Sequence, residues 1–258
     1  MVAHARAPAL LGGSVMLAHS LAPARGGAPY FVVSPHLDDA VFSCGMLLAS
    51  HPGSIVCTVF CGEPDPAQQT PWDASAGYED SSVAMRARIA EDEQALAIVG
   101  ARALRLPFLD SQYGDTPSLE DLAGALTCAW RRTGAPRLVA PLGLYHSDHV
   151  LVGDACRLIA QRERLNDVVV CEDALYRAIE DIASRRYAEL GENGIGFAPL
   201  PEPIARTVHH AGAADVKRRA VRAYRSQLRA LDDPDPHDLA EPERYMQLVI
   251  DPARQPPA

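Results

Sequence analysis

The stretch "YFVVSPHLDDAVFSCG", Tyr30 to Gly45, joins an apolar run to a cluster of ionisable side chains. The run of strand-forming residues stops at Pro35, and His36, Asp38 and Asp39 follow it within four positions. A helical pattern begins immediately afterwards. Helix capping would explain aspartates at such a position, whereas histidine is a poor helix cap. The stretch therefore predicts a strand that delivers a histidine and two carboxylates to the start of a helix, where they form a site.

The same order of strand and helix recurs along the chain. The predicted strands are apolar and rich in β-branched residues, which suits a parallel sheet covered on both faces. Strands are predicted at residues 30–34, 54–62, 103–108, 137–142, 167–173, 203–210 and 245–250. Helices are predicted through residue 50 and at residues 82–100, 118–134, 147–162 and 214–231. This alternation predicts an α/β fold, a Rossmann-like three-layer sandwich with a mostly parallel sheet and helices on both faces.

The 258 residues are predicted to contain one domain, residues 29–258, after a weakly ordered leader at residues 1–28. The leader has a short apolar segment but no clearly basic start, so a signal peptide is the alternative and not the first expectation. No run of about 18 apolar residues occurs, and no membrane span is predicted. The six cysteines form no CxxC pair and lie mostly in apolar runs, which predicts buried thiols in a reducing compartment, the cytoplasm.

Composition and missing motifs exclude several classes of protein. A net charge of −9 and a pI of about 5.4 argue against a nucleic-acid binder. The basic stretch Val216–Arg225 is interpreted as the solvated side of an amphipathic helix. The turn after the first strand lacks a glycine-rich phosphate motif, and its two carboxylates would repel a phosphate group. The G-x-S-x-G motif of serine hydrolases is also absent from the sequence.

A second polar cluster, "GLYHSDH" at residues 143–149, follows the fourth predicted strand. Like the first cluster, it is followed at once by a helical pattern. Open α/β sheets bind their ligands beyond the carboxyl ends of the strands, near the change in strand order. We therefore expect His146, Asp148 and His149 to meet the residues of the first cluster at this edge of the sheet.

Three of these side chains match a catalytic metal site. His36 and Asp39 are three residues apart across the strand-to-helix turn and can converge on one point, and His149 can supply a third ligand. A catalytic zinc ion takes three protein ligands and leaves one position open for water. The same set of two histidines and one carboxylate also suits Fe2+. Asp38 then remains beside the metal as the predicted general base.

Two residues of the second cluster are predicted to be catalytic without binding the metal. Protonated His146 would stabilise the oxyanion of a tetrahedral intermediate or protonate a leaving amine. Asp148 would hold His146 in its charged form and in the right orientation.

The motifs "PHLDD" and "HSDH" resemble those of the PIG-L/LmbE-like N-deacetylase family, and weaker similarity extends over most of the chain. Members of this family are zinc-dependent and remove acyl groups from amino-sugar conjugates. The resemblance implies that His36, Asp39 and His149 bind the metal. It also implies that Asp38 is the general base and that His146 is its electrostatic or acid partner. The spacing of the residues predicts the same roles.

Two further residues are predicted to contact the substrate. The stretch "RIAEDEQALAIVG" is similar to a helix of the same family, which implies that Arg88 faces the substrate; a surface salt bridge is the alternative. Asp110 follows the third predicted strand, where its carboxylate would accept sugar hydroxyls or cap a turn. Substrate specificity is predicted to reside in the polar loop 62–81 and in the poorly patterned segment 174–203.

Together the residues and the resemblance predict a zinc-dependent hydrolase. Its substrate would be a small N-acylated molecule, with N-acetyl on an amino sugar or a sugar conjugate as the first expectation. A metal-dependent amidase that acts on a thiol conjugate or another non-sugar amide is one alternative. A non-catalytic α/β ligand-binding module is the other. No nucleic-acid partner is predicted, and a homo-oligomer is compatible with the sequence.

Overall fold

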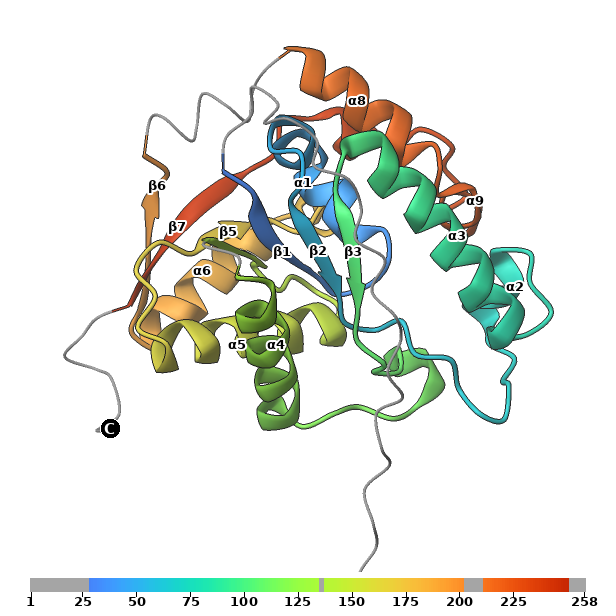
Figure 1. Cartoon of the computed structure of the whole chain (residues 1–258), viewed down its shortest axis with the longest axis horizontal. Coiled ribbons are helices and arrows are strands. Elements are labelled where there is room, and N and C mark those ends of the chain that lie inside the picture. The colour runs from blue at the N-terminus through green and yellow to red at the C-terminus, as the bar shows by residue number, and fades with distance from the viewer. Residues whose placement is uncertain (1–27, 135–136, 202–210, 251–258) are drawn as a thin grey trace, which may run out of the picture.

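The computed structural model describes residues 28–134, 137–201 and 211–250. These residues form a seven-stranded sheet in the order β3-β2-β1-β4-β5-β7-β6 (Figure 1). Its strands are β1 Tyr30–Ser34, β2 Ile55–Thr58, β3 Arg102–Arg105, β4 Arg137–Pro141, β5 Val169–Cys171, β6 Ile195–Pro199 and β7 Tyr245–Ile250. The strand predicted at residues 203–210, and the predicted leader except for its last residue, lie outside the described residues.

The sheet is mostly parallel, as predicted. Strands β1 to β5 pair in parallel, whereas β7 is antiparallel to both of its neighbours, β5 and β6. The chain leaves β1 toward β2 and β3 on one side and then continues with β4 and β5 on the other side. The carboxyl ends of β1 and β4 therefore flank the point at which the strand order reverses. Open α/β sheets bind ligands at this point.

Helices cover both faces of the sheet (Figure 1). One face packs against α1 Asp39–Ser50, α3 Ser81–Val99 and α8 Ala211–Val221, and the other against α4 Leu119–Thr133, α5 Ser147–Arg162 and α6 Ile182–Glu192. Along β1, Tyr30 and Val32 join the first of these two cores, and Phe31 and Val33 join the second. Both faces of β1 are buried, which explains its continuous apolar run. The predicted three-layer α/β sandwich is confirmed.

Three segments differ from the prediction. The predicted loop 62–81 contains a short helix, α2 Pro71–Ser75, and the poorly patterned segment 174–203 contains α6 and β6. The helix predicted at residues 214–231 is divided into α8 and α9 Arg225–Ala230. The remaining short elements are α10 His237–Ala240 and the 3-10 turns Ser111–Tyr113 and Tyr176–Ala178.

The division between α8 and α9 has a structural cause. Ser226 lies in the first turn of α9, where backbone amides have no partner within the helix. Its amide and its hydroxyl both donate to the buried carboxylate of Glu91 in α3, at 3.0 and 2.6 Å. The new helix start thus supplies a free backbone amide, which the interior of a continuous helix could not supply.

The cysteines are free thiols, and five of the six are buried. The prediction of buried thiols is wrong for Cys128 of α4, which is exposed. Among the helices of the described chain, none is long and apolar enough to cross a membrane.

Candidate metal centre and active site

The β1–α1 turn, residues 35–38, is held in place by the last residue of β1 and by the first residue of α1. The hydroxyl of Ser34 donates to the carbonyl of His36 at 2.6 Å and accepts an amide at the start of α1 at 2.9 Å. The amide of His36 donates to Oδ2 of Asp39 at 2.8 Å. Asp38 occupies the N-cap position of α1, yet its side chain makes no capping hydrogen bond. The Asp38 carboxylate is therefore available for other contacts.

The β4–α5 turn, residues 142–146, is built differently. Gly143 has a φ of 81°, and a Cβ there would lie 2.9 Å from the carbonyl oxygen of His149. Only glycine combines this backbone conformation with such a close approach. At the end of the turn, Nδ1 of His146 accepts the amide of Asp148 at 3.2 Å and thereby caps α5. The expectation that the histidines are not helix caps is wrong for His146.

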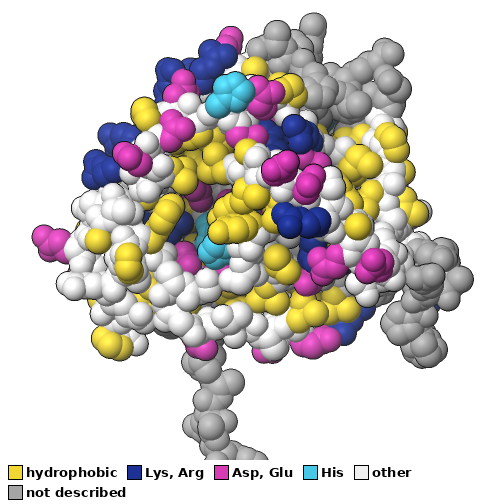
Figure 2. Space-filling view, turned by 180° about the vertical axis from the view of Figure 1, so that it is seen from behind, with side chains coloured by type: hydrophobic (Ala, Val, Ile, Leu, Met, Phe, Trp, Pro, Cys, Tyr) yellow, Lys and Arg dark blue, Asp and Glu magenta, His cyan; other side chains and the backbone are white. Residues whose placement is uncertain are grey.

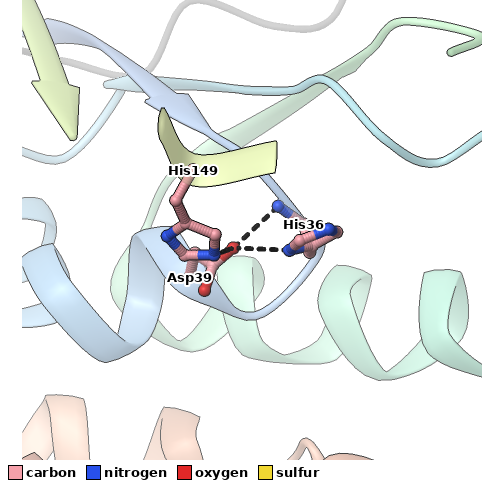
Figure 3. A group of neighbouring side chains, drawn as sticks. All are labelled: His36, Asp39 and His149. Carbon is pink, nitrogen blue, oxygen red and sulfur yellow. Dashed lines mark hydrogen bonds and ion pairs between the residues drawn. The ribbon is translucent and has the colours of Figure 1, made fainter. Parts of the chain in front are cut away.

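The three predicted metal ligands come together at the carboxyl ends of β1 and β4 (Figure 3). Nδ1 of His36 lies 3.2 Å from Oδ2 of Asp39, and Nε2 of His149 lies 3.1 Å from the same oxygen. One ligand atom from each residue lies within 4.8 Å of the others. Both imidazoles are thus turned toward one carboxylate.

His149 is oriented by Asp173, a residue that the sequence analysis did not single out. Asp173 lies shortly after β5, and its Oδ1 is 2.6 Å from Nδ1 of His149. Its Oδ2 accepts the amides of Gly143 and Leu144 at 2.9 and 3.1 Å. A carboxylate in this position fixes the imidazole and increases the basicity of its other nitrogen. The sequence does contain a signal for Asp173. This residue closely follows β5, which pairs with β4, and polar residues also follow β1 and β4.

The buried Nε2 of His149 indicates that a cation belongs at this point. It has no hydrogen-bond partner in the part of the chain that the structure describes, although Oδ2 of Asp39 is 3.1 Å away. A proton or a metal ion can bridge such a pair, and metal binding then displaces the proton. His36, Asp39 and His149 therefore fit a divalent metal ion. A second group, His36 with His146 and Asp148, also meets within 4.8 Å, but in it Nδ1 of His146 already accepts an amide.

Buried carboxylates dominate the electrostatics of the centre. Burial alone would lower the pKa of His149, but Asp39 and Asp173 raise it to about 9. Burial also opposes protonation of His36, and Asp110 and neighbouring carboxylates nevertheless raise its pKa well above the usual value. The excess of negative charge attracts cations to this point.

Asp38 differs from the other carboxylates of the centre because it pairs with no histidine among the residues that the structure describes. Burial is the main cause that raises its pKa, followed by the negative charge of Asp39, and Arg88 lowers it in part. The result is a pKa of about 6. Asp38 is half-buried and lines the cavity described below. A carboxylate with these properties is suited to accept a proton near neutral pH.

Asp148 was predicted to orient the side chain of His146, but its carboxylate contacts His36 instead. Its Oδ2 lies 3.0 Å from Nε2 of His36 and accepts the amide of Ser111 at 3.1 Å. Only its backbone amide contacts His146. Burial, and after it the charge of His36, lower the pKa of His146, and Asp148 opposes this in part. The structure thus favours a neutral His146, whereas the sequence predicted the protonated form.

Arg88 and Asp110 lie side by side at the same edge of the sheet. Arg88 of α3 is only 3% exposed, so the alternative of a surface salt bridge is wrong. Its Nη1 lies 3.6 Å from Oδ2 of Asp110, and its Nε and Nη1 have no hydrogen-bond partner among the described residues. Asp110 caps a 3-10 turn by accepting the amide of Gln112 at 3.1 Å. The capping alternative therefore holds for Asp110, although it also faces the cavity.

A cavity of about 220 Å³ opens onto these residues. Six of the predicted site residues line it: His36, Asp38, Asp39, Arg88, Asp110 and His146. Apolar side chains form the rest of its wall, among them Phe42, Trp72, Leu175, Tyr176 and Leu231. Figure 2 shows histidine and acidic side chains inside a hollow that hydrophobic side chains surround. Trp72 and Tyr176 come from the two segments that were predicted to determine specificity.

The fold and the site together define an α/β protein with a site of two imidazoles and one carboxylate, suited to a metal, at the switch point of its sheet. The family model of PIG-L, GlcNAc-PI de-N-acetylase, matches residues 31–160. The chain belongs to this family, which confirms the resemblance of its motifs. The matched segment includes both the β1–α1 turn and the β4–α5 turn.

Several solved structures share the fold. The A40926 pseudoaglycone deacetylase is 23% identical, with 90% of this chain and 99% of that chain covered and a TM-score of 0.64. A deacetylase–teicoplanin complex is 22% identical, with 88% and 100% covered and a TM-score of 0.65. The zinc-inhibited form of teicoplanin deacetylase is 20% identical, with 86% and 98% covered and a TM-score of 0.64. No curated protein sequence matches the chain.

Proposed function

We propose that this protein is a metal-dependent hydrolase that removes an N-acyl group, N-acetyl first of all, from an amino sugar or a sugar conjugate. The observation that carries the proposal is the half-buried carboxylate of Asp38 beside the cluster of His36, Asp39 and His149, all at the switch point of the sheet. Membership of the GlcNAc-PI de-N-acetylase family and the shared fold of the two glycopeptide deacetylases support it.

We assign His36, Asp39 and His149 as ligands of a zinc ion, with Fe2+ as the alternative. The lone Nε2 of His149 and the zinc named for one structural neighbour support this assignment. A metal ion held there supplies Lewis acidity for amide hydrolysis. Asp173 holds the His149 ring through Nδ1, and the carboxylate of Asp148 holds the His36 ring through Nε2. In each ring the other nitrogen is left for the metal ion.

Asp38 acts as the general base. It takes the proton from the water molecule that attacks the amide carbonyl, and it returns a proton to the amine that leaves. Its pKa of about 6 leaves the carboxylate mostly ionised at neutral pH, while the acid form stays accessible for the second step.

His146 acts as a neutral hydrogen-bond donor. Because its Nδ1 accepts the amide of Asp148, the proton of the neutral ring is on Nε2. This N–H stabilises the oxyanion that develops on the carbonyl oxygen. Asp148 thus holds His146 through its backbone and His36 through its carboxylate.

Arg88 and Asp110 bind hydroxyl groups of the substrate. Both side chains line the cavity, so the guanidinium of Arg88 offers donors to a polyol and the neighbouring carboxylate of Asp110 offers acceptors. We also propose that residues 29–258 form a single catalytic domain. The six free thiols support a reducing compartment, the cytoplasm.

The test is a screen of N-acetylated amino sugars and their glycosides for release of a primary amine, with zinc-loaded protein. Hydrolysis of at least one amino-sugar derivative, and loss of this activity with a chelator, are the expected results. Hydrolysis of simple non-sugar amides alone would replace the sugar substrate by the amidase alternative. A protein that binds amino sugars but releases no amine with zinc or iron would be a binding module.

A further inference from the structure

Tyr145 in the β4–α5 turn combines high exposure with a disfavoured backbone. The residue is 67% exposed, the highest value among the large hydrophobic residues of the described chain. Its φ of 58° lies in the left-handed region, which residues with a Cβ rarely adopt. Gly143, two residues earlier, shows that glycine occupies such a position where close packing requires it. Glycine would fit this backbone without strain, so the presence of a tyrosine calls for an explanation in its side chain.

The ring of Tyr145 lies against a second tyrosine that lines the cavity. The ring centroids of Tyr145 and Tyr176 are 5.5 Å apart, and Tyr176 in turn packs edge to face on the ligand His149 at 4.9 Å. Tyr176 follows Leu175, which also has a positive φ of 68°. Two loops that are distant in the sequence thus use disfavoured backbone to bring two aromatic rings together beside the metal centre.

Hydrogen bonds to the carboxylate of Asp238 hold the loop that contains Tyr176 in place. The amide of Leu175 donates to Oδ2 of Asp238 at 2.7 Å, and Nε of Arg177 donates to Oδ1 of the same carboxylate at 2.9 Å. Both guanidinium and carboxylate are largely buried. These bonds stabilise the positive φ of Leu175 and thereby fix the position of the Tyr176 ring. We call Tyr145 and Tyr176 together the aromatic shelf.

The aromatic shelf leads from the cavity to the surface. Tyr176 belongs to the cavity wall, whereas Tyr145 lies outside it and is open to solvent. The cavity of about 220 Å³ is smaller than the sites that enclose drug-sized ligands, which measure roughly 300–1,000 Å³. A substrate larger than one acylated sugar therefore has to extend over the rim, where the aromatic shelf lies.

We propose that the aromatic shelf is a specificity-determining subsite that binds a second ring of the substrate, joined to the acylamino sugar. The ring presents its face to the tyrosines, as aromatic rings and the C–H faces of saturated sugars both do. This inference rests on the proposed function and adds the substrate class to it: ring-extended amino-sugar glycosides are preferred over small ones.

The experiment compares three glycosides of N-acetylglucosamine, which carry a methyl, a phenyl or a second sugar group, on zinc-loaded protein. The phenyl or the disaccharide substrate should exceed the methyl glycoside in kcat/KM by about three- to tenfold. The two ring-bearing substrates distinguish an aromatic ring from a sugar ring. Tyr145→Gly should bring the ratio of ring-extended to methyl glycoside close to one, and Tyr145→Phe should keep it.

A matched control separates the ring from the backbone. Arg164 is also exposed, has a φ of 54° and lies beyond the far end of α5 from the site. Arg164→Gly should raise Tm, because glycine accepts a positive φ without strain. Tyr145→Gly gains the same relief but loses the ring contact with Tyr176, so its Tm should rise less. Only Tyr145→Gly should lose the preference for ring-extended substrates. Loss of this preference in Tyr145→Gly, with the preference kept in Arg164→Gly, is a result that the relief of backbone strain alone would not give.

Two outcomes would overturn the inference in different ways. Equal kcat/KM for all three glycosides, or an unchanged ratio in Tyr145→Gly, contradicts the aromatic shelf and leaves the proposed function intact. Hydrolysis of none of the three glycosides contradicts the proposed function and the inference with it.

Discussion

The β1–α1 turn and the β4–α5 turn lead into the same cavity, but they are built in different ways. In the β1–α1 turn no residue has a positive φ, Ser34 holds the backbone, and Asp38 keeps its side chain out of helix capping. In the β4–α5 turn Gly143 and Tyr145 have positive φ values, and His146 caps α5. In the first turn the proposed general base, Asp38, thus takes no part in supporting the backbone, whereas in the second turn His146 combines helix capping with its proposed catalytic role. Substitutions should reveal this difference.

Removal of a proposed metal ligand from the β1–α1 turn should have the largest effect. His36→Ala is expected to lower the bound metal from about one ion per chain to none and to abolish activity, because a catalytic site needs its three protein ligands. Elemental analysis of the purified protein measures this. His237→Ala is the control, since His237 is an exposed histidine in α10 whose side chain pairs, within the described part of the chain, only with Glu241 at 3.6 Å. Full metal occupancy in His36→Ala would refute the ligand set.

Asp38→Asn should keep the metal and lose turnover. The amide cannot accept the proton from water, and loss of a general base lowers kcat by roughly 10²- to 10⁴-fold. Because the Asp38 side chain makes no capping hydrogen bond, Tm should stay close to the original value. Asp39→Asn should instead lose metal as well as activity. Hydrolysis at the original rate in Asp38→Asn would show that another group is the base.

In the β4–α5 turn the functions of His146 can be separated by two substitutions. His146→Asn should keep the helix cap, because asparagine is a favourable N-cap, but it lacks the imidazole N–H. Its kcat should fall by about 10²-fold at nearly constant Tm. His146→Ala should lose the same activity and about 1 kcal/mol of stability in addition. Equal unfolding free energies for both variants, measured by denaturant titration, would contradict the capping role.

The fold and the meeting of His36, Asp39 and His149 could be predicted because their signals are local. The apolar run of β1 reflects burial on both faces, and each of the two polar clusters follows a strand. The conformation of Tyr145 could not be predicted in this way. Its left-handed backbone and its contact with Tyr176 depend on how two loops meet in space.

The segment after β5 shows why other parts could not be predicted. Helix α6 buries Arg186 and Leu190 on its inner side, so an arginine interrupts the apolar period. The guanidinium of Arg186 pairs with Asp154 of α5 at 2.9 Å, a partner that the sequence does not indicate. Strand β6 contains Gly196 and Pro199, which strand patterns normally exclude, and it pairs only at the edge of the sheet. Tertiary contacts, not local preference, decide these elements.

Asp173 tests whether support from a neighbouring strand matters as much as the turn itself. Asp173→Asn keeps an oxygen for the amides of Gly143 and Leu144 but loses the charge opposite His149. Metal affinity should fall by about 10- to 100-fold, as for other residues that orient a ligand histidine. Competition with a chelator of known affinity measures this change. An unchanged affinity would mean that the β4–α5 turn positions His149 without help from β5.

The smallest effect should come from Ser34, which supports the β1–α1 turn without entering the cavity. Ser34→Ala removes the hydroxyl that joins the carbonyl of His36 to the start of α1, and it should lower the unfolding free energy by about 1–3 kcal/mol while the metal remains bound. Ser50→Ala is the matched control: its hydroxyl bonds only to the carbonyl of Met46 within the same helix, and its loss should change stability little. If both variants lose the same stability, the Ser34 bridge is not what holds the turn. The contrast between the two turns would then depend on His146 alone.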